Sequence, residues 1–315
     1  LVLHQLYPQA DFYTAFYNRH SAPWVKNWVI KTSFLNSFPG WIKKSRILSL
    51  PFLPRAFESF NFYRQKYDLV VSVTSSFAKG IITPPETCHI CYLLTPTRFL
   101  WEDWQTYFPH SLSAYVALPY LEYLRRWDYV AAMRPDYYLA ISKTVAGRCK
   151  KYYHQLAEVV YPPFDYNYWL KLKQQKVKTV RLPQRFYLAV ARLEAYKRID
   201  FLVNYFNCHP QDNLVIVGTG TQFRLLKKRA RKNIYFTGQI KDQELAGLYY
   251  QAKALLMPQQ EDFGYTALEA QSMGCPVVAL SAGGALETIK NEKTGIFFYQ
   301  LSLSAFEKAL ASLSL

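Results

Sequence analysis

Six short apolar runs, separated by stretches with helical periodicity, fill the chain from residue 183 onward. The runs consist almost entirely of aliphatic and aromatic residues, and they are residues 186–190, 214–217, 234–236, 254–257, 276–279 and 295–298. Runs of this length and composition predict strands that are buried on both faces. Because helical stretches lie between them, we expect a parallel sheet with helices on both sides, which is a doubly wound α/β domain.

The first half of the chain shows the same kinds of element with less regularity. Strands are expected at residues 10–16, 68–73, 89–94, 137–141 and 158–160. A helical pattern covers residues 115–132, and Ser142 is placed to cap a helix over residues 142–153. We therefore expect a second Rossmann-like domain here. Residues 1–6 have the pattern of a helix end without a preceding strand and glycine-rich turn, so we expect this domain to be truncated at its amino end.

A break in the pattern separates the two halves. It begins at Pro162 and Pro163 and continues through a lysine-rich stretch that contains Lys171, Lys173, Lys176 and Lys178. Such a composition is typical of a linker. The predicted organisation is an amino-terminal domain over residues 1–163, a linker over residues 164–182 and a carboxy-terminal domain over residues 183–315.

The chain carries a formal net charge of +16. That charge suits a solvated basic surface, or attraction to an anionic membrane surface or an anionic substrate. Nucleic acid is disfavoured as a partner because the charge is dispersed and no nucleic-acid-binding module is recognisable. Residues 21–66 mix Trp24, Trp28 and Trp41 with lysines, a pattern that suits either a membrane interface or an aromatic core beneath solvated lysines.

Hydropathy and cysteine usage bear on the compartment. No apolar run approaches the roughly 20 residues that a membrane-spanning helix needs. The five cysteines are scattered and odd in number, which favours structural thiols in a reducing compartment over a disulfide framework. We therefore expect a cytoplasmic protein, either free or peripheral on the inner face of the membrane.

Loops that follow the predicted strands of the second domain carry cations and glycines. Arg192 offers a planar fork and Lys197 a point charge near a helix start, which suits a diphosphate or, alternatively, an ordinary basic surface pair. Glycines in the later loops allow the backbone to approach a flat ring or a phosphate. These glycines are Gly218, Gly238, Gly283 and Gly284.

Two carboxylates, Glu261 and Glu269, lie eight positions apart near the end of the predicted strand at residues 254–257. The first is expected on a loop and the second inside the helix that follows. Carboxylates accept paired hydrogen bonds from the vicinal hydroxyl groups of a sugar or a ribose. Together with the two cations, these carboxylates predict a nucleotide-sugar as the ligand.

Taken in order, these motifs resemble glycosyltransferase family 4, whose members have the GT-B fold of two facing Rossmann-like domains. Glu261-x-Phe-Gly-x-x-x-x-Glu269 is similar to the family's paired-glutamate motif, and Arg192-Leu-x-x-x-Lys197 is similar to its diphosphate clamp. Met273-Gly-Cys-Pro-Val277 and Gly283-Gly-x-x-Glu287 fit the elements that follow. The first domain resembles a bacterial mannosyltransferase-like subgroup, through Phe57-Glu-Ser-Phe, Phe77-Ala-Lys-Gly80, Thr95-Pro-x-Arg98, Trp101 and Tyr161-Pro-Pro163.

The resemblance implies retaining transfer of a mannose-like or glucose-like hexose from a GDP- or UDP-linked sugar to a glycan or lipid-linked acceptor. It implies that Arg192, Lys197 and Glu261 are catalytic, with the two cations stabilising charge on the leaving diphosphate. The donor-binding residues that it implies are Gly218, Gly238, Phe263, Gly264, Tyr265, Thr266, Glu269, Gly283 and Gly284. Glu269 would hold the ribose. No cofactor and no metal are implied, and the sequence has no Asp-x-Asp motif for a metal ion.

One departure from the subgroup's pattern leaves a second interpretation open. The subgroup usually has a histidine before Thr-Pro, facing the reacting sugar, where this chain has Leu94. His89 lies five positions earlier, which is roughly 16 Å along a strand. The alternative is a protein that binds a nucleotide-sugar without catalysis. A basic module that binds membranes or polyanions is a third and less specific interpretation.

Overall fold

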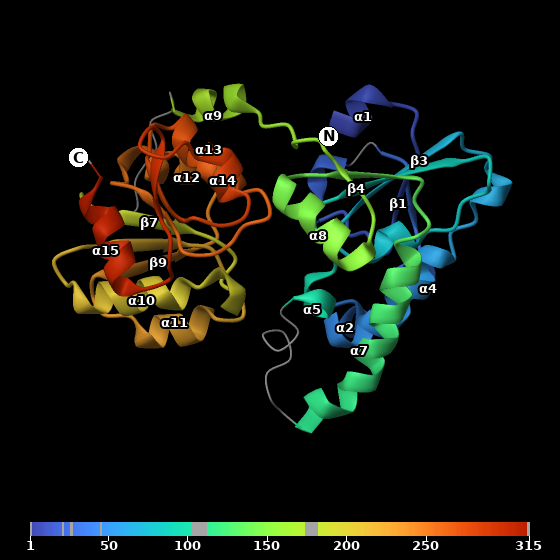
Figure 1. The fold of residues 1–315 in the computed structure, drawn as a ribbon, viewed down its shortest axis with the longest axis horizontal. Coiled ribbons are helices and arrows are strands. Elements are labelled where there is room, and N and C mark those ends of the chain that lie inside the picture. The colour runs from blue at the N-terminus through green and yellow to red at the C-terminus, as the bar shows by residue number, and fades with distance from the viewer. Residues whose placement is uncertain are drawn as a thin grey trace. The chain divides into compact units, whose positions relative to one another are not determined.

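The computed structural model describes residues 2–20, 22–25, 28–44, 46–102, 112–173 and 182–313 (Figure 1). The chain forms two compact units, Leu1–Pro163 and Phe164–Leu315. Each unit is built around its own parallel sheet.

The second unit contains all six strands that the apolar runs predict. They are β7 (Tyr187–Val190), β8 (Leu214–Val217), β9 (Ile234–Gly238), β10 (Leu255–Met257), β11 (Val277–Leu280) and β12 (Gly295–Phe298). The strands are parallel, and their order in the sheet is β12-β11-β10-β7-β8-β9. From β7 the chain therefore builds outward in one direction and then, beginning at β10, in the other. Such a reversal is the switch point at which open α/β sheets bind ligands.

Helices cover both faces of this sheet because the strands are apolar at successive positions. Leu188 and Val215 belong to one core, while Ala189 and Ile216 belong to the core on the opposite face. One core includes residues of α9 (Tyr166–Lys173), α12 (Asp242–Gln251), α13 (Tyr265–Ser272) and α14 (Ala285–Thr288). The other includes residues of α10 (Ile199–Cys208), α11 (Phe223–Arg229) and α15 (Leu303–Ala311). The predicted doubly wound architecture is confirmed for this unit.

Part of the segment expected to be a linker belongs to the second unit. Helix α9 occupies residues 166–173, and its Trp169 is buried, with its ring 5.9 Å from the ring of Tyr249. An apolar side chain within a lysine-rich stretch therefore anchors this helix, which the linker prediction did not include. The rest of the expected linker, residues 174–181, lies outside the described residues.

The first unit has a four-stranded parallel sheet of order β3-β4-β5-β6. These strands are β3 (Leu69–Thr74), β4 (Cys88–Leu93), β5 (Tyr137–Ala140) and β6 (Glu158–Val159). A separate two-stranded sheet pairs β1 (Phe12–Thr14) with β2 (Ile30–Thr32), and β2 was not expected from the sequence. The helices are α1 (Val2–Leu6), α2 (Gly40–Lys44), α3 (Arg46–Ser49), α4 (Leu53–Glu58), α5 (Arg98–Trp101), α7 (Leu112–Ala131) and α8 (Lys143–Tyr153). The predicted cap of α8 is confirmed, since the Ser142 hydroxyl accepts a hydrogen bond from the Val145 N–H.

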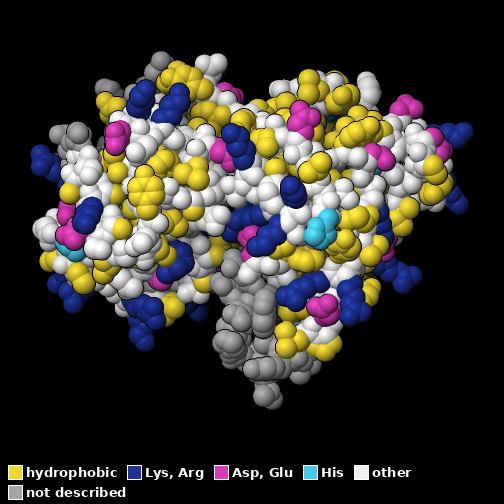
Figure 2. All heavy atoms as spheres, in the orientation of Figure 1, with side chains coloured by type: hydrophobic (Ala, Val, Ile, Leu, Met, Phe, Trp, Pro, Cys, Tyr) yellow, Lys and Arg dark blue, Asp and Glu magenta, His cyan; other side chains and the backbone are white. Residues whose placement is uncertain are grey.

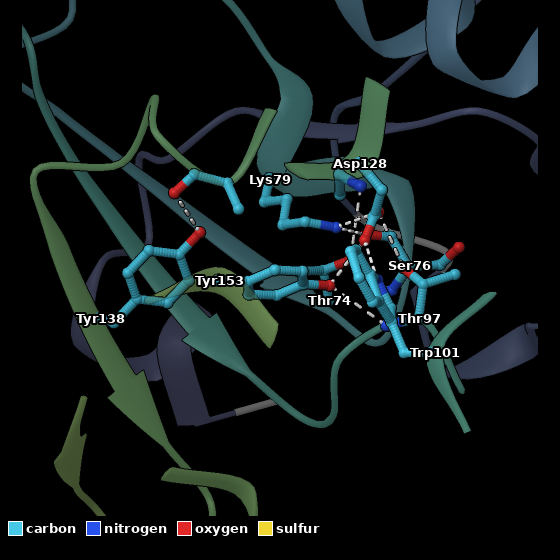
Figure 3. A network of polar contacts seen from close by, with 10 residues as sticks. Thr74, Ser76, Lys79, Thr97, Trp101, Asp128, Tyr138 and Tyr153 are labelled. Atoms are coloured by element: carbon cyan, nitrogen blue, oxygen red, sulfur yellow. Dashed lines mark hydrogen bonds and ion pairs between the residues drawn. The ribbon is translucent and has the colours of Figure 1, made fainter. Parts of the chain in front are cut away.

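A buried ion pair organises the loops after β3 and β4 (Figure 3). The Lys79 ammonium donates to Asp128 of α7, and both side chains are fully buried. The Asp128 carboxylate also accepts hydrogen bonds from Thr97 Oγ1 at 2.9 Å, Trp101 Nε1 at 2.8 Å and the Tyr153 hydroxyl at 2.8 Å. One carboxylate thus joins two loops at the carboxyl edge of the sheet to helices α7 and α8. The four donors compensate for removing its charge from water.

Replacing Asp128 by asparagine is expected to lower the free energy of unfolding of the first unit by about 3–5 kcal/mol, because it leaves the Lys79 charge buried without its counterion. Chemical denaturation followed by circular dichroism measures this loss. Glu122→Gln is the matched control, since Glu122 lies on the same helix and its carboxylate, 52% exposed, pairs with Arg125 and Arg126 at the surface. That change should cost about 0–1 kcal/mol. Equal effects of the two substitutions would contradict the assignment.

Candidate functional site

The candidate site lies at the switch point of the second sheet, where β7 and β10 are neighbours. The loop after β7 runs through residues 191–194 into a short 3-10 helix, Ala195–Lys197, and then into α10. The loop after β10 runs from Pro258 to Gly264 and leads into α13. Since parallel strands end at the same edge of a sheet, these loops meet there.

Lys197 and Glu261 form an ion pair across this edge. The Lys197 Nζ lies 2.7 Å from both carboxylate oxygens of Glu261. The two side chains are only 13% and 16% exposed, so solvent screens their attraction less than it would at an open surface. Both residues are predicted site residues on separate motifs, and the structure brings them into direct contact.

Tyr196 links the second predicted cation to the pair. The Arg192 guanidinium donates to the Tyr196 hydroxyl at 3.0 Å. The Lys197 ammonium lies 5.3 Å from the centroid of the Tyr196 ring, within the range of a cation–π contact. Arg192 is exposed, so its planar fork is available at the surface of the same edge. Tyr196 occupies one of the unspecified positions of the Arg192-Leu-x-x-x-Lys197 motif.

Gln259 is a second residue without a role in the sequence analysis. It follows directly after Pro258 at the end of β10, and its side-chain Nε2 donates to the Glu261 carboxylate at 2.7 Å. The residue is 2% exposed. A polar side chain directly after an apolar strand is the signal in the sequence that could have identified it.

Gly283 and Gly284 allow two loop backbones to pass very close to each other. A Cβ at Gly283, where φ is +67°, would lie 2.3 Å from the Glu261 carbonyl oxygen, and one at Gly284 would lie 2.4 Å from the Phe263 Cα. The Gly284 N–H donates to the Glu261 carbonyl at 2.8 Å. Both glycines are predicted to let the backbone approach a phosphate, and in the structure the Gly284 N–H also fixes the backbone that carries Glu261.

Gly218 also lies where neighbouring loops approach each other closely. The Gly218 N–H donates to the Gly238 carbonyl at 2.8 Å, which joins the loop after β8 to the end of β9. A Cβ at Gly218 would lie 2.0 Å from the Ala191 carbonyl oxygen, in the loop that leads to Arg192. Gly218 is therefore needed where the backbones after β7 and β8 cross.

The start of α13 follows the Glu261 loop directly. Gly264 adopts a left-handed conformation with φ of +94° immediately before the helix begins at Tyr265. The buried Phe263 ring lies 5.2 Å from the ring of Tyr265. Thr266 occupies the next position of the helix and is half-buried. This turn carries the Phe263 to Thr266 backbone from the sheet edge into the first turn of α13.

Glu269 is held from the neighbouring helix α12. The hydroxyl of Tyr249, a fully buried residue, donates to the Glu269 carboxylate at 2.9 Å. Burial raises the pKa of Glu269 above its ordinary value, and the hydrogen bond from Tyr249 opposes that rise. Trp169 of α9 packs against the ring of Tyr249. Helix α9 therefore supports the tyrosine that holds Glu269, a predicted donor-binding residue.

In the first unit, His89 is enclosed within the sheet. It has no exposed surface, and its Nε2 lies 2.8 Å from the Ser72 hydroxyl on β3. Burial lowers the pKa of His89 to about 4, so the imidazole is neutral at pH 7. Leu94 follows the end of β4 and is half-buried. The structure therefore agrees with the expectation that His89 does not replace a histidine at position 94.

Neither unit provides a ready metal centre in the parts that the structure describes, since no group of three histidine, cysteine, aspartate or glutamate side chains there is arranged to hold a metal ion.

Tyr249→Phe is expected to lower the free energy of unfolding by about 1.5–3 kcal/mol at pH 7, where it removes a hydrogen bond to a charged carboxylate. A folded-state pKa of Glu269 above the unfolded value means that stability falls as pH rises through that interval. Without the Tyr249 hydroxyl the pKa of Glu269 rises further, so the variant gains relatively more stability than the unmodified chain as the pH falls. The loss in free energy of unfolding should therefore shrink to about 0.5–1.5 kcal/mol at pH 4.

Denaturation curves at the two pH values provide the measurement. Tyr250→Phe is the control, because the adjacent Tyr250 is 64% exposed, and it should change stability by less than about 0.5 kcal/mol at either pH. A loss in Tyr249→Phe that does not depend on pH would contradict the role of the hydroxyl.

Known proteins show similarity that is concentrated in the second unit. Residues 171–315 match the family model described as Glycosyl transferases group 1. The alpha-1,3/1,6-mannosyltransferase ALG2 of Rhizomucor pusillus is 25% identical over 199 residues, which are 48% of this chain and 44% of that protein. A glycogen synthase of Mycobacterium tuberculosis is 37% identical over 119 residues, 35% of this chain and 29% of that protein. The chain thus spans less than half of the length of these curated relatives.

Solved structures share the fold. HepE from Anabaena, in complex with UDP and glucose, has a TM-score of 0.64 and 17% identity over 98% of this chain and 84% of that chain. Sucrose-phosphate synthase from Thermosynechococcus elongatus has a TM-score of 0.62 and 20% identity over 90% and 74%. These likenesses confirm the predicted class of two Rossmann-like domains of GT-B type. Arg192, Lys197, Glu261 and Glu269 all lie inside the range that matches the family model described as Glycosyl transferases group 1.

Proposed function

We propose that the protein is a glycosyltransferase that moves a mannose-like or glucose-like hexose from a nucleoside-diphosphate sugar to a glycan or lipid-linked acceptor, with retention at the anomeric carbon. The observation that carries this proposal is the Lys197–Glu261 pair at the switch point of a sheet that matches the glycosyl transferases group 1 model. A cation for a diphosphate and a carboxylate for sugar hydroxyl groups lie side by side there.

Similar proteins support a nucleotide-linked donor without selecting its base. The HepE structure contains UDP and glucose. A Mycobacterium tuberculosis protein that is 34% identical over 113 residues is named a GDP-mannose-dependent mannosyltransferase. We therefore propose a UDP- or GDP-linked sugar as the donor, in agreement with the sequence analysis.

Arg192 and Lys197 are proposed to stabilise the charge that develops on the leaving diphosphate. The exposed guanidinium of Arg192 can bind two phosphate oxygens at once, and Lys197 supplies a compact charge beside it. Positively charged side chains that are already in place when the bond breaks lower the barrier without a reorganisation cost. In this proposal the two cations take the role that a divalent metal ion has in other transferases, so no metal is required.

Glu261 and Glu269 are proposed to bind the two sugars of the donor. The Glu261 carboxylate lies on the loop after β10, where the transferred hexose would meet the cations, and it can accept hydrogen bonds from hydroxyl groups. Glu269, held by Tyr249, would accept hydrogen bonds from the ribose. The backbone from Phe263 to Thr266 at the start of α13 would contribute N–H groups to the anionic part of the donor.

The test is a panel of UDP- and GDP-linked hexoses, with hydrolysis or transfer measured for the unmodified chain and for Arg192→Ala and Glu261→Gln. Removing one charge-stabilising group should lower the rate by about 100- to 1000-fold. Arg198→Gln is the matched control, since Arg198 lies next to Lys197 but is 47% exposed and pairs with Asp200, and it should retain activity. Absence of binding to every nucleotide-sugar would overturn the proposal.

Leu94 favours a second candidate function, binding of a nucleotide-sugar without catalysis. The resembled subgroup has a histidine at this position, and the buried His89 is not placed to serve instead. Calorimetry would then show donor binding, no turnover in the unmodified chain, and no gain of turnover in Leu94→His. Transfer by the unmodified chain would exclude this candidate.

We also propose that an exposed aromatic face of the first unit meets an anionic membrane surface, which would place the protein on the inner face of a cytoplasmic membrane. Phe34, Trp41 and Phe52 are 39%, 65% and 41% exposed, and Phe38 contacts both phenylalanine rings. Basic side chains are spread over both units in the view of Figure 2, which would add a general attraction to anionic lipid. None of the described helices is long and apolar enough to span a bilayer.

Co-sedimentation with vesicles tests the membrane proposal. Binding is expected to vesicles that contain phosphatidylglycerol and to weaken as salt is raised, because the charge attraction is screened. Trp41→Ala should reduce binding, whereas Tyr299→Ala, which removes a 74% exposed aromatic ring of the second unit, should not. Equal binding to neutral vesicles, or equal loss in both variants, would contradict the proposal.

A further inference from the structure

We propose that Gln259 is a positioning residue that holds the Glu261 carboxylate in place when the donor diphosphate engages Lys197. The inference rests on the proposed function and adds a residue that neither the motifs nor the family match assigns. It follows from the three contacts that the Lys197 and Gln259 side chains make with the two oxygens of the Glu261 carboxylate.

The contacts on Glu261 come from two side chains of different character. Lys197 Nζ lies 2.7 Å from Oε1 and 2.7 Å from Oε2, and Gln259 Nε2 lies 2.7 Å from Oε1. The ammonium of Lys197 is charged and partly exposed, whereas the amide of Gln259 is neutral and 98% shielded, being 2% exposed. Only the first of these donors is placed to be drawn away by an arriving anion.

The orientation of the Gln259 amide is decided by Glu261. Turning the amide over would place its carbonyl oxygen against a carboxylate oxygen, and two acceptors at hydrogen-bond distance repel each other. In the observed orientation the Gln259 Oε1 is buried and has no hydrogen-bond partner among the described residues. A buried acceptor without a partner is unfavourable, so the contact with Glu261 outweighs that cost.

Binding of a diphosphate changes the balance of these contacts. Lys197 has three N–H groups, and phosphate oxygens would compete with Glu261 for them. As Lys197 turns toward the diphosphate, Glu261 loses the partner that orients it. Gln259 Nε2 keeps its hold on Oε1, which leaves Oε2 directed at the donor and able to accept a hydrogen bond from a hexose hydroxyl.

The test separates the sugar from the nucleotide in binding. Isothermal titration calorimetry gives the Kd values of UDP, UDP-glucose, GDP and GDP-mannose, and the Kd ratio of each diphosphate to its sugar form measures the sugar contribution. Gln259→Met keeps the length of the side chain but removes the N–H donor. We expect the Kd of the diphosphates to change by less than about twofold, and the sugar contribution to fall by about tenfold or more, as for loss of a hydrogen bond to a charged group.

Gln260→Met is the matched control, because Gln260 is the exposed neighbour on the same loop. It should change neither the diphosphate Kd nor the sugar contribution. If Gln259→Met weakens diphosphates and sugar nucleotides by the same factor, the residue merely supports the fold and the inference is overturned.

Gln259→Glu provides a second and independent readout, which also decides the matter if the methionine variant does not fold. Position 259 contacts the charged group of Glu261 on the same loop and, through it, that of Lys197. At pH 8 two adjacent carboxylates repel, so the sugar contribution should be lost. Near pH 5.5 the pair can share one proton, which restores a donor to Glu261, and the sugar contribution should recover. Gln259→Met should show no such recovery.

The outcomes for the inference and for the proposed function are distinct. A chain that binds none of the four ligands overturns the proposed function and, with it, the role of Gln259. A chain that binds the sugar forms more tightly than the diphosphates, with the same preference in Gln259→Met and no pH-dependent recovery in Gln259→Glu, supports the function and overturns the inference.

Discussion

The reversal of strand order between β7 and β10 is the constraint on which the second unit depends. Two halves of a parallel sheet grow in opposite directions from this point, so the loops that leave β7 and β10 diverge to opposite faces and leave an edge between them. Lys197 lies on the loop after β7 and Glu261 on the loop after β10, and the ion pair between them links the two loops. The approach of the Gly283 and Gly284 backbone to the Glu261 loop then fixes the position of the carboxylate.

Two ion pairs in the molecule differ in burial, and this difference suits one to stabilising the fold and the other to binding a ligand. The side chains of Lys79 and Asp128 are completely buried. Each of the two Asp128 carboxylate oxygens accepts from two donors, and the four donors come from four segments of the first unit. This pair therefore stabilises the fold of the first unit. The side chains of Lys197 and Glu261 are partly exposed. The Glu261 carboxylate accepts hydrogen bonds from fewer side chains than that of Asp128, namely Lys197 and Gln259. An ion pair of the second kind retains the freedom to accept a ligand between its members.

Strands were the most predictable part of this protein. The six apolar runs of the second unit each became a strand, because uninterrupted Val, Ile, Leu and Phe at that length are stable only when both faces are covered. Helix α9 and strand β2 were missed for the opposite reason. Each is short, each lies in a stretch rich in lysine and aromatic residues, and each depends on a contact from elsewhere, Tyr249 for Trp169 and β1 for β2.

Sequence alone determined the fold class and the residue types of the candidate site. The periodicity of apolar residues, the glycines after strands and the spacing of Glu261 and Glu269 are local properties, so they can be identified from the sequence without coordinates. Tertiary structure decided which of those residues meet. The partners of Glu261 include Lys197, 64 positions away, and the partner of Glu269 is a tyrosine on another helix. Contacts over such separations depend on strand order and backbone approach, and neither leaves a local pattern in the chain.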